Sequence, residues 1–448
     1  MMLADSRLAL AALFGIALSI FLIVRGRLHP FVALLCGAFV IGPLSGLSLP
    51  DTAKAVQKGV GDVLGGIGLV VALGLALGTM LQLSDGAAGL ARMMIGRAEA
   101  RRAPWMSLLV ALVLGLPLFF ETGLVLLLPI VASAAAGLAV SKERDFIKLR
   151  LMLSALTGLS VIHALVPPHP GPLLAVATLN ANLGLTIIYG VLVAVPTAIV
   201  AGPLLSLITA RSVVLAPTPP LPTVTSMHPA QTWRALFVVL LPVVLIAAGQ
   251  VEALLPPSLA PHFAWLSLAS NPVLALLLAC LVALPLLFGT RMVEAEVQQS
   301  IWQETMKPAG AILLAIGAGG ALKQVLVSAG LSDLLARLAA TGSLSPILLA
   351  WSIAVAIRLA TGSATVATIT AAGIMPGVVA ATGASPEWIV LAIGAGSVFF
   401  SHVNDPGFWL VKSYLGTSTQ ATFRTWSMLE TVVSVMGLGT VLVLSRLL

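Results

Sequence analysis

The sequence predicts an all-α polytopic membrane protein with two inverted repeats, each holding a re-entrant helical hairpin and a broken transmembrane helix. Three observations lead to this fold class. The 448 residues include 23 Lys and Arg and 16 Asp and Glu, so that 9% are charged, whereas a soluble domain carries about 25%. Apolar runs long enough to cross a bilayer recur along the chain. Four of these runs are interrupted by proline, glycine or charged residues.

The composition excludes a soluble fold and a nucleic-acid-binding protein. A mean hydropathy of +1.09 leaves too few charges to cover a surface in water. The net charge of +7 is a small surplus and not a basic face. Cys36 and Cys280 lie far apart in apolar runs, with neither a disulfide framework nor a metal-ligand spacing. We therefore expect the lipid bilayer as solvent, no nucleic-acid partner and no metal or organic cofactor.

Ten apolar runs match the length of about 20 residues that a helix needs to cross the hydrocarbon core. The first of them ends at Arg25 without a small-residue cleavage pattern, so we interpret it as a span and not as a signal peptide. The predicted spans are residues 8–24, 28–49, 63–83, 149–180, 184–210, 233–250, 272–288, 308–329, 388–417 and 425–447.

Two further stretches, 104–140 and 345–383, are too long for one span and are interrupted in the middle. We interpret each as a hairpin that enters the membrane, turns at depth and leaves on the same side. The first turns at the string FFETG, residues 119–123, and the second at TGS, residues 361–363.

Two of the spans are also broken. The span 149–180 contains PPHPGP at 167–172, and the span 388–417 contains HVNDPG at 402–407. Proline removes a backbone donor and clashes with the preceding turn, so neither stretch forms a continuous helix. Irregular backbone at membrane depth persists only where protein buries it or where it lines a polar cavity. Four breaks in one chain therefore indicate a site.

The order of these elements predicts an internal repeat. In each half a span is followed by a hairpin, a broken span and a closing span. Five crossings separate the first spans of the two copies, and because five is odd, the second copy is inverted. The predicted units are N-terminal spans 1–62, a first repeat 63–210 with hairpin 104–140, a cytoplasmic proline-rich linker 211–232, connecting spans 233–307, and a second repeat 308–448 with hairpin 345–383.

Lys and Arg predict the orientation, because they accumulate in cytoplasmic loops. With both termini outside, sixteen of these residues fall in inside loops and five in outside segments. We therefore expect both termini to be extracytoplasmic.

Placing a charged residue at membrane depth costs free energy, so each such residue is expected to have a structural or functional role. Glu121 at the first hairpin turn is either salt-bridged for structure or a protonatable group facing a substrate cavity. Asp405 and His169 each precede a Pro-Gly pair at a helix break, which suggests an ion pair or a proton relay between them. His163 is a further candidate for a coupling proton. A metal site on His163 and His169 lacks a third ligand at a suitable spacing.

Hydroxyl groups and glycines at the hairpin turns suggest a carboxylate site. A helix N-terminus offers free backbone amides and a partial positive charge, both of which attract an anion. A Ser or Thr hydroxyl group at that position adds a further hydrogen-bond donor. The alternative is that these hydroxyl groups are ordinary helix caps. Arg358 either binds a substrate carboxylate or neutralises Asp405 or Glu121. Glu430, near the inner end of the last predicted span, reaches the interface or pairs with a neighbour. The candidate substrate-binding residues are Thr122, Gly123, His169, Arg358, Thr361, Gly362, Ser363, Thr365 and Asn404.

Four strings resemble those of the gluconate–proton symporter family of permeases: GLPLFFETG at 115–123, VIHALVPPHPGP at 161–172, RLATGSATVA at 358–367 and SHVNDPGFWLVK at 401–412. The resemblance implies proton-coupled uptake of a sugar acid, a homodimer and a substrate near both hairpin turns. Thr122 departs from the family pattern, in which an apolar residue such as valine is expected, and it adds a hydroxyl group at the turn.

The leading hypothesis is a proton symporter that imports gluconate or a related small sugar acid across a bacterial inner membrane. Glu121, Asp405 and His163 are the candidate proton carriers. One alternative is a carrier of D-serine or another small hydroxy or amino acid, with sodium not excluded as the coupling ion. A membrane-embedded enzyme using Glu121, His163 and Asp405 as acid and base is the third reading.

Overall fold

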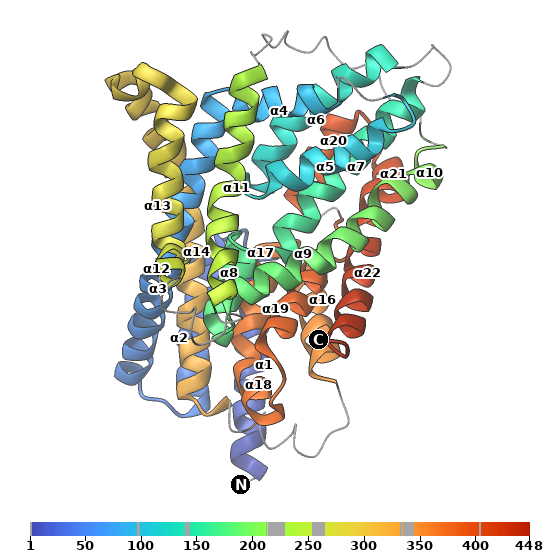
Figure 1. Cartoon of the computed structure of the whole chain (residues 1–448). Coiled ribbons are helices and arrows are strands. Elements are labelled where there is room, and N and C mark those ends of the chain that lie inside the picture. Colours follow the sequence, from blue (N-terminus) through green and yellow to red (C-terminus); the bar gives the residue numbers. More distant parts are fainter. Residues whose placement is uncertain are drawn as a thin grey trace.

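The computed structural model describes residues 2–95, 99–138, 144–211, 213, 229–252, 265–331, 334, 345–402 and 405–448. Every regular element in these ranges is a helix, as Figure 1 shows, which confirms the predicted all-α class. The linker 212–228 (apart from residue 213) and the loop 253–264 lie outside the described residues.

The N-terminal region is more helical than the sequence predicted. The span predicted at 63–83 belongs to a helix of 35 residues that begins after residue 48, because Ser48 caps it and accepts a hydrogen bond from the amide of Asp51. Lys58 and Asp62 form an exposed i,i+4 ion pair on this polar extension, so hydropathy did not reveal it. The elements are α1 (Met2–Val24), α2 (Pro30–Ser45), α3 (Leu49–Leu83) and the unpredicted α4 (Gly86–Ile95).

All four predicted interruptions coincide with helix ends. The first hairpin turns between α5 and α6, and the first broken span divides into α7 and α8 around the proline-rich string. A π-helical turn at Val200–Leu204 joins α9 to α10, so that residues 183–209 form one long helix. The bounds are α5 (Ala103–Gly115), α6 (Phe120–Leu138), α7 (Arg144–Leu165), α8 (Pro170–Leu179), α9 (Leu183–Ile199) and α10 (Ser206–Thr209).

The second half also divides at its two predicted interruptions. Its hairpin consists of α16 and α17, and its broken span of α19 and α20. The remaining bounds are α11 (Pro229–Glu252), α12 (Trp265–Ala269), α13 (Pro272–Ala283), α14 (Ala295–Ser328), α16 (Pro346–Thr361), α17 (Ala364–Ile374), α18 (Pro376–Thr382), α19 (Pro386–Ser397), α20 (Pro406–Leu415), α21 (Thr419–Thr422) and α22 (Met428–Leu444).

The helices have the length and surface of a multi-pass membrane protein. Within the described part of the chain, six helices are long and apolar enough to cross a membrane, or eight if each bent pair counts as one span. Large apolar side chains such as Leu10, Phe14 and Leu281 point outward and are more than half exposed, as lipid contact requires. The predicted number of ten full spans stays a prediction.

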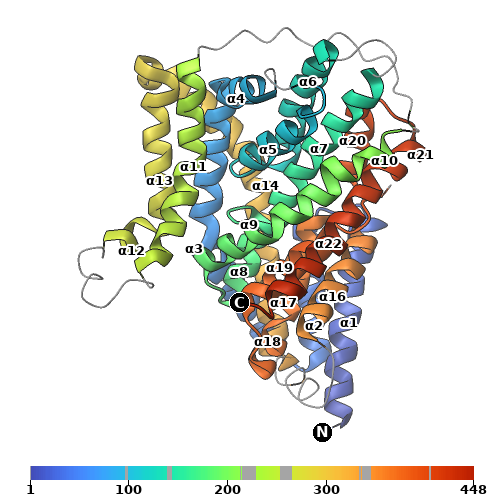
Figure 2. The same cartoon turned by 45° about the vertical axis from the view of Figure 1, so that its right-hand side comes forward.

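The broken helices lie at the centre of the molecule. The stretch Asp145–Leu179, which covers α7 and α8, is 89% buried over its most apolar window. In Figure 1 and Figure 2 the hairpin α5–α6 lies in the upper half and opens upward, whereas α16–α17 lies in the lower half and opens downward. Both chain ends lie toward the lower side. The two hairpins therefore approach the centre from opposite sides.

Two glycines allow the long helices α3 and α14 to pack closely. A Cβ atom added at Gly320 would overlap the carbonyl oxygen of Gly59, and one added at Gly59 would overlap the carbonyl oxygen of Gly320. Close backbone approach between small residues is a frequent basis of helix packing in membranes. This contact joins the N-terminal helices to the helix that precedes the second hairpin.

We expect Gly320→Leu to separate α3 from α14 and to destabilise the protein by about 1–3 kcal/mol, the usual cost of overpacking. Gly310→Leu on the same helix is the matched control, because Gly310 is exposed and nothing lies within 4 Å of an added Cβ. Thermal unfolding followed by size-exclusion chromatography measures both. Equal melting temperatures for the two variants would contradict the packing role.

Candidate functional site

A buried ion pair connects the second hairpin to the second helix break. Arg358 lies in the last turn of α16, and Asp405 is the N-cap residue of α20. Nη2 of Arg358 lies 2.5 Å from Oδ2 of Asp405, and the side chains are only 5% and 12% exposed. Nη1 of the same guanidinium donates to the carbonyl oxygen of Gly362 at 2.5 Å. One arginine therefore holds the hairpin turn and the broken helix together.

Asp405 also has partners from its own segment. Its Oδ1 accepts the amide of Gly407 at 2.7 Å, which caps α20, and its Oδ2 accepts the hydroxyl of Ser401. The hydroxyl oxygen of Ser401 in turn accepts the indole N–H of Trp426 at 2.8 Å. Both carboxylate oxygens are thus hydrogen-bonded. Of the roles considered for Arg358, the structure shows neutralisation of Asp405.

The expected pairing of Asp405 with His169 is wrong. Nε2 of His169 lies 2.6 Å from the carbonyl oxygen of Gly115 at the end of α5, and because a carbonyl only accepts, Nε2 donates. The carboxylate of Asp405 is occupied by Arg358, whose longer side chain reaches it from the end of α16. Each broken helix is therefore tied to the hairpin of its own half.

The second hairpin tip, residues 361–365, presents a helix N-terminus. Gly362 adopts a left-handed conformation with φ +71°, which a side chain would strain, and it ends α16. Ser363 is the N-cap of α17, and its hydroxyl oxygen accepts the amide of Val366 at 3.3 Å. Thr361 donates to the carbonyl oxygen of Ile357 at 2.9 Å. The amide ends at this tip carry partial positive charge.

A polar cavity of about 470 Å³ lies against this tip, within the range of about 300–1,000 Å³ typical of small-molecule sites. Its lining combines both halves of the chain, and it includes a carboxyl group and a hydroxyl group that the sequence analysis did not place there. The residues that line this polar cavity are Ile23, Pro30, Phe120, Ser160, His163, Arg358, Thr361, Gly362, Ser363, Ala364, Thr365, Val398, Asp405, Pro406, Gly407, Trp426 and Glu430.

The first hairpin tip, residues 116–123, reaches the polar cavity through Phe120, whose ring stacks on Trp426 with centroids 5.4 Å apart. Thr122 lines a separate cavity of about 540 Å³ with Gln82 and Lys307. The structure therefore does not bring Thr122 together with Ser363. Gly123 is buried, and an added Cβ would meet the side chain of Leu159.

Two predicted residues cannot be placed in full. The backbone of Glu121 lies in the first turn of α6, but its side chain lies outside the described residues. Asn404 also lies outside them.

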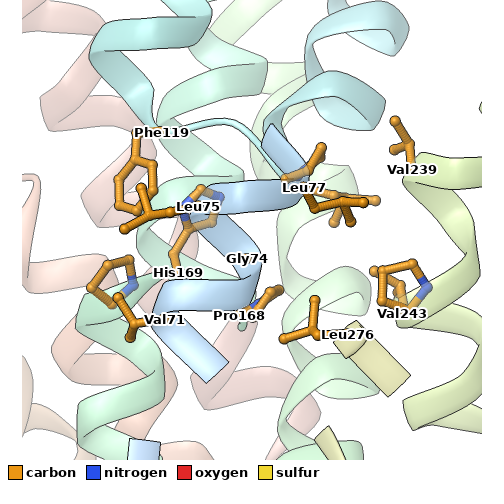
Figure 3. Close-up of a pocket in the computed structure, with 14 residues that line it drawn as sticks. Val71, Gly74, Leu75, Leu77, Phe119, Pro168, His169, Val239, Val243 and Leu276 are labelled. Atoms are coloured by element: carbon orange, nitrogen blue, oxygen red, sulfur yellow. The ribbon is translucent and has the colours of Figure 1, made fainter. Parts of the chain in front are cut away.

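The two histidines of the first break lie side by side but face different spaces. Their ring centroids are 5.1 Å apart. His163 lines the polar cavity, and its Nδ1 atom is buried without a hydrogen-bond partner among the described residues. His169 faces a narrow, mostly apolar pocket of about 20 Å³ beside Phe119, Leu75 and Val71, shown in Figure 3. In the described ranges no three His, Cys, Asp or Glu residues are grouped so as to hold a metal ion.

Sequence reasoning missed Glu430 as a member of the site. It assigned the last span to 425–447, which placed this residue near the membrane surface. In the structure the helical stretch begins at Thr419, and Glu430 lies near its middle with 2% exposure. The sequence feature that could have identified Glu430 as a site residue is that it is a lone carboxyl group within an apolar run.

Comparisons with known proteins show the family of this chain. A family model described as GntP family permease matches residues 8–447. The chain is 43% identical to a gluconate permease of Pseudomonas aeruginosa, over 99% of each chain. It is 36% identical to a high-affinity gluconate transporter of Escherichia coli, over 97% of this chain and 98% of the relative, and 36% identical to an L-idonate transporter of that organism over the same shares.

A solved structure shares the fold. The YdaH transporter of Alcanivorax borkumensis superposes with a TM-score of 0.62 over 94% of this chain and 98% of its own, at 16% identity. The architecture is thus one that a known transporter uses.

We expect Arg358→Gln and Asp405→Asn to destabilise the protein by about 3–5 kcal/mol each, because each leaves one buried charge without its partner. The double variant removes both charges and is expected to recover most of that loss. Thermal unfolding of the four proteins in detergent measures the coupling free energy. Additive losses in the double variant would show that the two side chains do not stabilise each other.

Proposed function

The chain belongs to the GntP family of permeases, and we propose that it imports gluconate or a closely related sugar acid across a bacterial inner membrane by proton symport. It is a permease and not an enzyme, since its relatives are named as permeases and transporters. The observation that carries the proposal is the polar cavity, where a helix N-terminus, a buried arginine and several hydroxyl groups face one space. The relatives named for gluconate and L-idonate support a polyhydroxy acid as substrate.

The substrate carboxylate binds at the second hairpin tip in this proposal. The free amides at the start of α17 and the hydroxyl of Ser363 attract an anion. Arg358 lines the same wall of the polar cavity and stays proposed as a substrate contact, although Asp405 balances its charge. Thr361, Gly362 and Thr365 shape this end of the site.

The substrate's hydroxyl groups extend toward the first half of the chain. His163 and Ser160 line that side of the polar cavity and offer hydrogen bonds. Thr122, Gly123, His169 and Asn404 stay proposed as substrate contacts in other states of the transport cycle, because alternating access changes which residues face the path.

The coupling proton requires an ionisable group beside the substrate. Glu121, Asp405 and His163 are the carriers proposed from the sequence. Of these, His163 and Asp405 line the polar cavity, and Asp405 is engaged by Arg358. No other cofactor is part of the proposal.

We also propose that the two halves are inverted repeats, residues 63–210 and 308–448, joined through the linker 211–232 and the connecting spans 233–307. The hairpins α5–α6 and α16–α17 open toward opposite ends of the molecule in both views, which supports this relation. Helix α3 starts before residue 63, so the N-terminal unit 1–62 ends within it.

The proposed orientation places both termini outside the cytoplasm. The excess of Lys and Arg in the loops assigned to the inside supports it. The protein is further proposed to be a homodimer whose outer surface faces lipid.

Purified protein in proteoliposomes is expected to accumulate labelled gluconate when the outside is acidic relative to the lumen. A proton entering with the anion supplies the driving force, so a proton uncoupler should abolish accumulation. A competition panel of L-idonate, glycerate and D-serine ranks the substrates.

The proton claim is wrong if accumulation requires a sodium gradient and persists with the uncoupler. The substrate claim is wrong if D-serine competes better than every sugar acid. Empty liposomes and liposomes without a gradient are the controls.

We expect Ser363→Ala to raise the KM for gluconate about tenfold, because it removes a hydroxyl donor worth roughly 1.5 kcal/mol to an anionic ligand. Ser418→Ala is the matched control: Ser418 caps α21 by accepting the amide of Ala421 at 3.2 Å, much as Ser363 accepts that of Val366 at 3.3 Å. Both variants lose a cap, but only the first loses a substrate contact. Initial-rate uptake measures the KM of both variants. Equal KM values for Ser363→Ala and Ser418→Ala would show that Ser363 is a helix cap and not a substrate contact.

A further inference from the structure

Glu430 is a carboxyl group buried at the middle of a membrane-spanning stretch. It lies on α22, within the apolar stretch Thr419–Leu444, and its exposure is 2%. Intramembrane carboxyl groups are rare, and they mark substrate or ion pathways and proton relays.

The carboxyl group of Glu430 is incompletely satisfied. Ser160 on α7 lines the polar cavity with it, and Oε1 of Glu430 is buried without a partner among the described residues. The nearest guanidinium, Arg358, is committed to Asp405 and Gly362. Glu430 therefore has no ion-pair partner of its own in the described part of the chain.

The groups that face Glu430 all line the polar cavity. His163 on α7, Arg358 on α16 and Asp405 before α20 are the charged or titratable residues in that lining besides Glu430 itself. The other helices packed against α22 carry groups that are engaged or turned away. Tyr189 on α9 stacks on Trp388, Glu387 on α19 accepts hydrogen bonds from Asn182 and Ser385, and Arg424 in the turn before α22 is exposed.

We propose that Glu430 binds the proton that is transported together with the anionic substrate. The inference rests on the proposed function and deepens it, because it names the carrier of the coupling proton. A bound proton makes Glu430 a neutral hydrogen-bond donor, and releasing the proton restores the carboxylate. Glu430 takes up a proton from the outside solution and gives it up to the cytoplasm, so one proton crosses with each anion.

The charges around the cavity explain why proton and substrate bind together. Arg358 contributes one positive charge, which Asp405 balances across 2.5 Å. An ionised Glu430 leaves the described cavity wall with a net negative charge, which repels a carboxylate substrate at short range in a medium of low dielectric constant. A protonated Glu430 removes that repulsion. Proton binding and anion binding therefore favour each other, and the coupling is reciprocal.

Unpartnered polar atoms on two helices point to the same conclusion. Nδ1 of His163 and Oε1 of Glu430 are both buried, both lack partners among the described residues and both belong to residues that line the polar cavity. Buried polar atoms are seldom left without a partner, and such atoms are often found at groups with a functional role.

The decisive variant is Glu430→Gln, an amide that mimics the protonated carboxyl group in shape and cannot release a proton. In proteoliposomes we expect gluconate exchange under equal concentrations to remain within about threefold of wild type, because the amide keeps a donor and an acceptor in place. Accumulation driven by a pH gradient is expected to disappear, as is the external alkalinisation that gluconate addition causes in wild type. Glu294→Gln is the matched control, since Glu294 is an exposed carboxylate paired with Arg291.

The dependence of the KM on pH distinguishes a proton-binding role of Glu430 from a purely structural one. In wild type the KM for exchange is expected to rise with pH, because ionised Glu430 opposes the anion. In Glu430→Gln the same KM is expected to be independent of pH. Glu430→Asp keeps the carboxyl group and is expected to retain proton flux with a shifted profile.

A test on the unmodified chain covers the case in which the variants fail to fold. Dicyclohexylcarbodiimide modifies protonated carboxyl groups in apolar surroundings, and peptide mass analysis locates the label. We expect labelling at Glu430 that decreases with rising pH and with gluconate present. The absence of label at Glu430 at acidic pH, or proton flux in Glu430→Gln equal to wild type, overturns the inference. If wild type itself moves gluconate without protons, the proposed proton symport fails, and this assignment fails with it.

Discussion

The ion pair between Arg358 and Asp405 is the interaction on which the polar centre of this protein depends. A membrane interior tolerates a helix break only where protein groups satisfy the freed backbone. Arg358 binds the carbonyl oxygen of Gly362 at the hairpin tip and the carboxylate that caps α20, so one side chain serves two breaks. Ser401 and Trp426 extend this network to the turn before α22. The walls of the polar cavity are positioned by these bonds.

In the two halves, different residues connect the broken helix to the preceding hairpin. In the first half His169, at the start of α8, reaches back to the carbonyl oxygen of Gly115 at the end of α5. In the second half Asp405, at the start of α20, is reached by Arg358 from the end of α16. In both halves the residue before a Pro-Gly pair is tied to the first arm of its own hairpin. Among these four residues, the ion pair lies in the second half, beside the second hairpin tip.

The described ion pairs divide sharply by environment. The pairs Lys58–Asp62, Arg291–Glu294 and Lys307–Glu304 are exposed neighbours on one helix or turn, a kind that contributes little to stability. The pair Arg358–Asp405 is buried and joins segments 47 residues apart. Among the described residues, the charged side chains that are buried are those of Arg358, Asp405 and Glu430, and all three line the polar cavity. In the proposed transport cycle, this grouping couples the binding of a proton to the binding of an anion.

The sequence by itself determined the helical class, the family resemblance and the positions of the breaks. These features are local: hydropathy identifies helices that lipid must surround, and proline and glycine interrupt a helix at their own positions. It did not predict the polar first half of α3 or the helix α4, because residues such as Lys58 and Asp62 lower the hydropathy of a helix that extends beyond the apolar run.

Only the tertiary structure decided which polar residues meet. It paired Arg358 with Asp405, separated Thr122 from Ser363 and placed Glu430 at the polar cavity beside Ser160 and His163. The physical reason is that these contacts join helices far apart in sequence, and the packing of whole helices sets them. A hydropathy pattern records how deep a residue lies in the membrane. It does not record which neighbour that residue faces.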